Sequence, residues 1–140
     1  MIGKTYEQIS IGDCEVFSKT ITETDIALFS AISGDFNPAH VNSEYAKKTK
    51  FKKRIAHGMI STSLISGVLG MKLPGPGTIY MSQTVRFTAP TYINDTLTAK
   101  VKVIEKLPKN RIKMETTCIN QEGILILEGE ALILAPIKQN

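Results

Sequence analysis

The chain is poor in the residues that build disulfide frameworks, metal clusters and membrane spans. Its 140 residues include only two cysteines, Cys14 and Cys118, which are isolated from each other and lack Cys-x-x-Cys spacing. This usage predicts reduced packing residues in a cytoplasmic protein, so we expect no disulfide, no metal and no cofactor. No apolar run approaches the roughly 20 residues that span a bilayer, and no signal-peptide pattern is present. We therefore expect no association with a membrane.

Charge is modest overall but concentrated in one segment. The net charge is +4, yet residues 47–54 hold five lysines and one arginine within eight positions. Such a run is most often a solvated surface, and its alternative role is to attract a phosphate-bearing ligand to a neighbouring site. Phe51 is the only aromatic residue within it, and no zinc-finger, glycine-rich or RNP-type pattern accompanies it. Nucleic acid is therefore not the expected partner.

The length of the chain predicts one domain over residues 1–140. Alternating residues over 13–21 predict a strand, and Thr22 resembles the N-cap of a helix that runs to Gly34. A short helix is expected after Asn42 or Ser43. The segment 56–71 predicts the longest and most apolar helix, buried with almost no face toward solvent.

After a proline- and glycine-rich loop at 73–77, the hydrophobic period changes from that of a helix to that of strands. Alternation predicts four consecutive strands, at 85–89, at 97–103, from Ile112 onward, and at 124–134. Strands that follow helices without βαβ alternation are typical of an α+β domain. We therefore expect an antiparallel sheet that covers one dominant helix.

The only two histidines lie near the residues most suited to acid–base chemistry. Asp35 precedes His40 by five positions, and Pro38 between them prevents one continuous helix and turns the chain back. Taken singly, a turn carboxylate or a buried histidine is the commoner interpretation. Together with Gly58, which follows His57 where the long helix begins, they favour an acid, a base and an oxyanion donor around one water molecule.

The long helix carries a stripe of small or polar residues on one side. At 100° per residue, Gly58, Thr62, Ser66 and Leu69 fall within about a quarter of its circumference. This stripe either lets the sheet approach closely or lines a ligand slot, with Gly58 at its mouth and Ser66 deeper. Ser66 is not expected to be a nucleophile, because no Gly-x-Ser-x-Gly elbow surrounds it.

These segments resemble the MaoC-like (R)-specific enoyl-CoA hydratases, also called hydratase 2. The likeness rests on residues 29–46, which contain Ser-Gly-Asp-x-Asn-Pro-x-His, and continues through Phe51, 54–59, 64–67, 73–75, Tyr80, Gln83 and Phe87. The resemblance covers most of the chain. At this length the chain looks most like the short stand-alone form that supplies (R)-3-hydroxyacyl-CoA for polyester (polyhydroxyalkanoate) synthesis. The resemblance implies a hot-dog fold, in which an antiparallel β-sheet wraps around one long central helix.

The resemblance also implies roles for individual residues. Asp35 and His40 match the catalytic pair that activates water, and the N–H of Gly58 matches the group that steadies the thioester oxygen. Ser66 matches a serine that lines the site, and Asn37, which fixes the turn or orients Asp35, is assigned with it to substrate binding. The family forms homodimers whose sheets join. The segment 47–54 is more basic than we expect of the short stand-alone members of this family.

The resulting hypothesis is reversible syn hydration of a trans-2-enoyl-CoA to the (R)-3-hydroxyacyl-CoA. Asp35 is assigned as the base toward water and His40 as its proton-handling partner, although the residues alone leave the reverse assignment open. Alternatives are dehydration of a 3-hydroxyacyl group on acyl carrier protein, hydrolysis of an acyl-CoA thioester, and a non-catalytic module that binds acyl-CoA or nucleic acid. The sequence leaves the acyl-chain length open.

Overall fold

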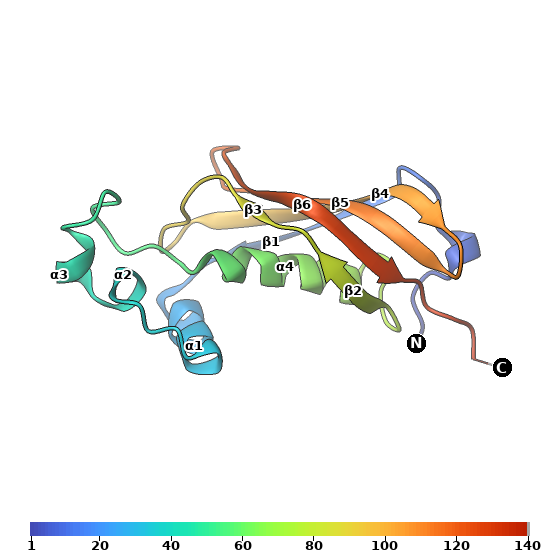
Figure 1. The fold of residues 1–140 in the computed structure, drawn as a ribbon, viewed down its shortest axis with the longest axis horizontal. Coiled ribbons are helices and arrows are strands. Elements are labelled where there is room, and N and C mark those ends of the chain that lie inside the picture. The colour runs from blue at the N-terminus through green and yellow to red at the C-terminus, as the bar shows by residue number, and fades with distance from the viewer. Residues whose placement is uncertain (140) are drawn as a thin grey trace.

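The computed structural model describes residues 1–139, which form an antiparallel sheet packed on a long helix (Figure 1). Along the chain the elements are η1 (Tyr6–Gln8), β1 (Cys14–Thr20), α1 (Glu23–Ser33), α2 (Pro38–Val41), α3 (Ser43–Ala46), α4 (Gly58–Met71), β2 (Ile79–Gln83), β3 (Arg86–Phe87), β4 (Thr96–Leu107), β5 (Arg111–Ile119) and β6 (Leu125–Leu134). Within the described residues, the strand order is β1-β4-β5-β6-β2, and β3 also pairs with β6. This is the expected hot-dog arrangement.

Side-chain alternation explains why the sheet covers α4. In β4 every second residue from Leu97 to Val103 is buried, and β5 buries Ile112 and Met114 in the same way. Because successive side chains of a strand point to opposite faces, these residues all meet the helix on one face of the sheet. The helix contributes Ile60, Leu64, Ile65, Val68 and Leu69 to the same core.

The prediction that α4 has almost no exposed face is wrong for the chain taken alone. Met59, Ser63 and Ser66 lie on an exposed side of the helix. The sheet covers only one side of α4, and no second layer formed by residues 1–139 covers the other. A mostly apolar composition therefore overstated how much of the helix is buried.

The start of α4 is also two residues later than expected. The backbone N–H of Ala56 donates to the carbonyl oxygen of Thr91 at 2.7 Å, and Ile55 forms an isolated bridge with Tyr92. These contacts hold both residues in extended backbone, so His57 becomes the N-cap and Gly58 the first helical residue. The position of the helix end is thus fixed by contacts with a loop distant in sequence.

The predicted strand and helix at the start of the chain are confirmed as β1 and α1. Thr22 caps α1 by accepting from the N–H of Asp25 at 3.1 Å, and Gly34 ends it in the left-handed region at φ 76°. Three further elements, η1, α2 and β2, were not predicted. A single turn begun by Pro38 has too few residues to show a helical period, and β2 alternates only weakly in burial.

The short helices extend the molecule beyond the sheet. Figure 1 shows α1, α2 and α3 at one end, past the N-terminus of α4, while both chain termini lie near the opposite end. The junction between these helices and the body of the molecule is formed by α4's first residues and the segment that precedes them. The candidate site lies at this junction.

Replacing glycine by alanine should have opposite effects on stability at two positions. At Gly129 in β6 an added Cβ would lie 1.8 Å from the carbonyl oxygen of Thr84, whereas at Gly67 in α4 nothing lies within 4 Å. Gly129→Ala should lower the free energy of unfolding by about 2–3 kcal/mol through overpacking. Gly67→Ala should raise it by about 0.5–1 kcal/mol through helix propensity. Urea denaturation checks both, and equal effects would contradict this account.

Candidate active site

Asp35 is held in a tight turn immediately after α1. Its N–H donates to the hydroxyl of Ser33 at 3.1 Å, and its Oδ1 accepts from the N–H of Asn37 at 3.0 Å. The side chain of Asn37 in turn accepts from the N–H of Ala39 at 3.0 Å and caps α2. The observed contacts of Asn37 are therefore local ones that fix the turn and orient Asp35. The proposed contact of Asn37 with substrate stays a prediction.

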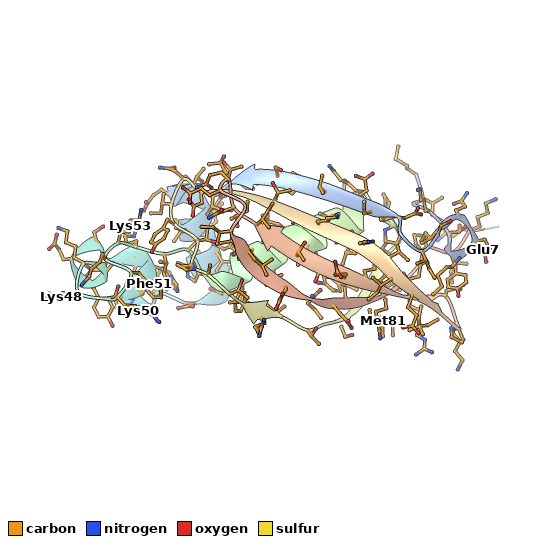
Figure 2. The ribbon with its side chains drawn as sticks, turned by 90° about the horizontal axis from the view of Figure 1, so that it is seen from above. Glu7, Lys48, Lys50, Phe51, Lys53 and Met81 are labelled. Carbon is orange, nitrogen blue, oxygen red and sulfur yellow. The ribbon has the colours of Figure 1, made fainter. Side chains whose placement is uncertain are left out.

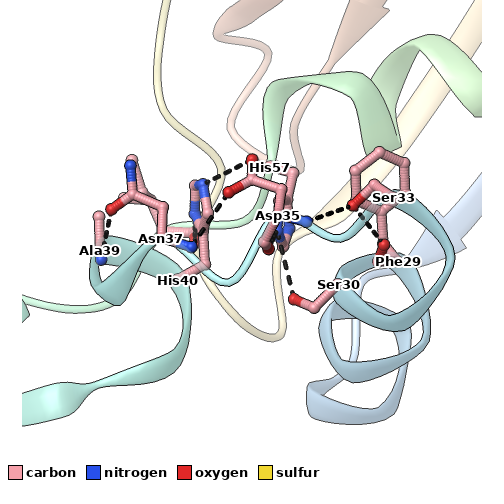
Figure 3. A network of polar contacts seen from close by, with 9 residues as sticks. Phe29, Ser30, Ser33, Asp35, Asn37, Ala39, His40 and His57 are labelled. Atoms are coloured by element: carbon pink, nitrogen blue, oxygen red, sulfur yellow. Dashed lines mark hydrogen bonds and ion pairs between the residues drawn. The ribbon is translucent and has the colours of Figure 1, made fainter.

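His40 faces Asp35 from α2 (Figure 3). Its Nδ1 lies 2.8 Å from the carbonyl oxygen of Ile55. Because a carbonyl oxygen only accepts, Nδ1 carries the proton and Nε2 is left with its lone pair. Nε2 lies 3.9 Å from Asp35 Oδ2, with the His40 side chain 12% exposed and that of Asp35 50% exposed. The structure thus brings the two predicted residues together across a gap.

His57 is packed directly behind this pair. It is 3% exposed, and its Nε2 lies 2.9 Å from the carbonyl oxygen of Asp35 and 3.3 Å from the hydroxyl of Ser30. Its ring centroid is 3.8 Å from that of His40 and 4.8 Å from that of Phe29. Its Nδ1 is buried without a hydrogen-bond partner among the described residues. His57 therefore connects the start of α4 to both members of the pair.

The three polar side chains open into one largely apolar cleft. A cavity of about 460 Å³ is lined by Asp35, His40, His57 and Gly58 together with apolar side chains that include Phe29, Met59, Phe87, Ala89 and Ile126. Gly58 is the first residue of α4, so its N–H has no acceptor within the helix. An added Cβ at Gly58 would lie 2.9 Å from the ring of Phe87. The bare backbone is therefore needed where the aromatic ring approaches.

Ser66 lies outside this cleft. It lines a separate hollow of about 420 Å³ between α4 and β2, to which Phe29 and Met59 also contribute. Leu69, expected on the same stripe, is buried in the core. The stripe is therefore split between the core and the surface. The predicted contact of Ser66 with substrate remains a prediction, and its distance from the cleft requires a ligand that reaches past Met59.

The hollow beside Ser66 contains a polar network to which the sequence assigned no role. The hydroxyl of Tyr80 donates to Gln83, whose side-chain amide donates to the hydroxyl of Thr116 at 2.8 Å. Burial raises the pKa of Tyr80 to about 12, so the phenol stays protonated and remains a donor at neutral pH. Tyr80 and Gln83 belonged to the sequence resemblance, but only their spatial neighbours reveal the network.

The same three side chains are a candidate group for a divalent cation. Ligand atoms of Asp35, His40 and His57 lie within 4.8 Å of one another. Because His40 Nδ1 and His57 Nε2 are used as donors to carbonyl groups, the carboxylate, His40 Nε2 and His57 Nδ1 keep free lone pairs. The carboxylate and His40 Nε2 suit either a water molecule or a cation, whereas His57 Nδ1 is buried. The absence of a metal and of a cofactor remains a prediction.

The cysteines differ in environment. Cys118 is buried, and burial raises its pKa to about 12. Cys14 is exposed, so the expectation that it packs inside the protein is wrong. Its position on β1 explains this, because among residues 1–139 β1 pairs only with β4 and exposes much of its length to solvent.

Comparison with known proteins gives consistent matches over almost the whole chain. The family described as MaoC like domain matches residues 13–123. The chain is 48% identical to an (R)-specific enoyl-CoA hydratase of Rhodospirillum rubrum, covering 95% of this chain and 92% of that protein. The structure of an unliganded R-hydratase from Pseudomonas aeruginosa is 47% identical, with a TM-score of 0.93 over 97% of this chain and 88% of the other. The structure of an (R)-hydratase of Aeromonas caviae involved in polyhydroxyalkanoate biosynthesis is 36% identical, with a TM-score of 0.90. It covers 93% of this chain and 99% of the other.

The hydrogen bonds predict opposite tautomers for the two histidines. His40 should carry its proton on Nδ1, facing the carbonyl of Ile55, and His57 should carry it on Nε2, facing that of Asp35. Long-range ¹H–¹⁵N correlation spectra at pH 8 distinguish the tautomers. Because the chain has two histidines, one His40→Gln variant assigns both sets of ring signals. Identical tautomers for the two rings would contradict the hydrogen bonding described above.

Proposed function

The chain belongs to the MaoC-like domain family, and we propose that it works as follows. It catalyses the reversible (R)-specific hydration of trans-2-enoyl-CoA to (R)-3-hydroxyacyl-CoA. Asp35 and His40 hold the reacting water between them, and the N–H of Gly58 faces the thioester oxygen. The observation that carries this assignment is the 3.9 Å gap between His40 Nε2 and Asp35 Oδ2, which opens into the cleft beside Gly58.

The gap fits the needs of the reaction. Addition of water across a conjugated thioester attaches a hydroxyl group to C3 and a proton to C2, with an enolate oxygen in between. Asp35 accepts one proton of the water as its oxygen bonds to C3, and returns that proton to C2 on the same face. His40 Nε2 accepts a hydrogen bond from the second O–H of the water. Proton transfer by a positioned carboxylate therefore accounts for syn addition.

The apolar lining and the helix end stabilise the intermediate charge. The negative charge on the enolate oxygen meets an N–H at the positive end of α4. One such donor contributes about 10²- to 10³-fold to the rate, and a positioned acid or base about 10²- to 10⁴-fold. The largely apolar cleft strengthens both effects by excluding water once the acyl chain is bound.

Removing either member of the pair should abolish most turnover while leaving the fold intact. Asp35→Asn removes the base, and His40→Gln removes the acceptor at Nε2. Each should lower kcat for crotonyl-CoA by at least about 10²-fold. The measurement is loss of enoyl absorbance, with circular dichroism to confirm folding. Glu7→Gln, at the opposite end of the molecule (Figure 2), is the matched control and should be silent. Near-normal rates in either variant would refute the assignment.

The same assay separates hydration from the alternative reactions. Loss of enoyl absorbance without free thiol indicates hydration, whereas release of thiol indicates thioester hydrolysis. Binding of crotonyl-CoA without any loss of absorbance indicates a non-catalytic module. Running the assay with and without EDTA tests whether Asp35, His40 and His57 act with water alone. We expect EDTA to leave the rate unchanged.

A homodimer is the assembly that the exposed edge of the sheet supports. Within the described residues, β2 pairs only with β6, so its other edge presents free backbone groups. Ile79 and Met81 on this strand are exposed at 57% and 47%. The hollow beside Ser66 lies along the same edge. A second copy that pairs at β2 would cover the exposed side of α4 and bring Ser66 into an enclosed site.

A charge placed on this edge should prevent pairing. Met81→Lys should halve the mass observed by sedimentation velocity, because burying an unpaired ammonium group at the joined edge is unfavourable. Ile11→Lys, a substitution at an exposed apolar residue outside the strands, is the control and should leave the assembly unchanged. An unaltered sedimentation coefficient for the folded Met81→Lys protein would exclude β2 as the contact.

A further inference from the structure

The segment 47–54 forms a distinct basic lobe at one end of the molecule. Its members are Lys47, Lys48, Lys50, Lys52, Lys53 and Arg54. Figure 2 shows Lys48, Lys50 and Lys53 around Phe51, beyond the end of the sheet and opposite Glu7. The lobe follows α3 and leads directly to the extended residues before α4. The reaction chemistry described above does not use any of its charges.

Most of this charge is uncompensated. Lys47 pairs with Glu44 at 2.6 Å, and Arg54 pairs with Glu23 at 2.7 Å. Among the residues described, Lys48, Lys50, Lys52 and Lys53 have no carboxylate within ion-pair distance, and all four are exposed. Four like charges on one short segment raise the local concentration of anions.

The backbone of the lobe is held in a defined turn. The hydroxyl of Thr49 donates to the carbonyl oxygen of Ala46 at 2.7 Å and accepts from the N–H of Phe51 at 3.2 Å. Lys52 then occupies the left-handed region at φ 63°, where glycine fits without steric cost. A lysine at such a position keeps a charge at the expense of backbone strain. The turn therefore presents its amines from a fixed base.

The lobe is continuous with the cleft. Lys50 and Phe51 line the same cavity as Asp35 and His40. The amine of Lys50 lies over the ring of Phe51, 5.2 Å from its centroid. Arg54 donates from Nε to the carbonyl oxygen of His40 at 2.6 Å, which ties the end of the lobe to the catalytic pair. A ligand that extends from beside His40 toward the lobe therefore passes Lys50 as it leaves the cavity.

We propose that the basic lobe binds the phosphate groups of the nucleotide end of coenzyme A. This inference rests on the proposed function, which places the neutral acyl end of the thioester in the apolar cleft. The remaining charge of the substrate lies on its diphosphate and 3′-phosphate, and lysine binds phosphate as a point charge without demanding a fixed geometry. The lobe contacts only this remote part, so its contribution appears in KM and leaves kcat unchanged.

A triple substitution removes the charge without disturbing the turn. Lys48→Ser/Lys50→Ser/Lys52→Gly deletes three uncompensated lysines and places glycine where φ is positive. The matched control is Lys100→Ser/Lys102→Ser/Lys109→Gly, which removes the same charge from exposed positions on β4 and the turn after it. Lys109 also has a positive φ, of 64°, so both variants carry the same backbone change.

Three substrates divide the nucleotide end into parts. We compare crotonyl-CoA, crotonyl-3′-dephospho-CoA and crotonyl-pantetheine, which has no phosphate. The lobe variant should raise KM for crotonyl-CoA about tenfold, because each exposed charge pair contributes a few-fold. The rise should be smaller for the dephospho substrate and absent for crotonyl-pantetheine. The control variant should change no KM by more than about twofold.

Several results would overturn the inference. One is a KM for crotonyl-CoA that stays at the wild-type value in the lobe variant. Another is an equal rise in KM for crotonyl-pantetheine, because such a rise indicates general damage to the protein. Crotonyl-acyl carrier protein is assayed as a fourth substrate, and a rise in KM confined to it would make the lobe a dock for the carrier protein instead. Calorimetric binding of adenosine 3′,5′-bisphosphate, which reports the lobe without turnover, should weaken about tenfold in the lobe variant only. If wild type hydrates none of the thioesters, the proposed function fails, and this binding measurement still decides the inference.

Discussion

The buried imidazole of His57 is the point at which the fold determines the site. The sheet fixes α4 by burying one side of it, and the bridge at Ile55 stops the helix from extending backward. His57 is thereby held at the helix start, where its Nε2 reaches the carbonyl of Asp35 and its ring lies against His40. Because one rigid side chain contacts both residues, their separation follows from the packing of the core. Loops positioned by such a scaffold are where catalytic groups are commonly found.

The sequence predicted those features that depend on local chemistry. Thr22 and Gly34 bound α1 because a capping hydroxyl and a left-handed glycine act within a single turn. Alternation identified β4 to β6 because one face of each strand is buried. The closeness of Asp35 and His40 was predictable because Pro38 limits how the four residues between them fold. The sequence did not determine what surrounds α4. It left open whether the helix is covered on both sides and whether Ser66 faces the cleft.

The errors about burial share one physical cause. Burial of a helix face depends on which element lies over it, and that element is distant in the chain. Ser66 and Leu69 fall on the same stripe by periodicity, yet the sheet covers Leu69 and leaves Ser66 at the surface. The single turn of α2 is too short for any period, and its boundary is set by the cap at Asn37. The role of His57 likewise depends on contacts with Asp35 and His40 that its own neighbours in sequence do not indicate.

In the proposed complex, the apolar cleft and the basic lobe each bind one part of a ligand that is itself divided. A cleft lined by Phe29, Met59 and Phe87 offers little solvation to a phosphate, and an exposed turn of lysines offers nothing to an acyl chain. Each part of a long amphipathic thioester therefore has one favourable position, and the two positions together fix the direction in which it lies. In the proposed complex, that direction places the thioester carbonyl near Gly58, where the helix begins.

In the proposed mechanism, the distance between Asp35 and His40 is what allows them to act on a third atom. If the carboxylate contacted Nε2 directly, two hydrogen-bond acceptors would face each other, and no room would be left between them for a water molecule. If they lay much farther apart, no single water molecule would reach both. At 3.9 Å an oxygen atom fits between them off the line that joins them, with a normal hydrogen bond to each. The local bonds that hold the pair apart, from Asn37 to the carboxylate and from the imidazole to Ile55, are therefore as necessary as the pair itself.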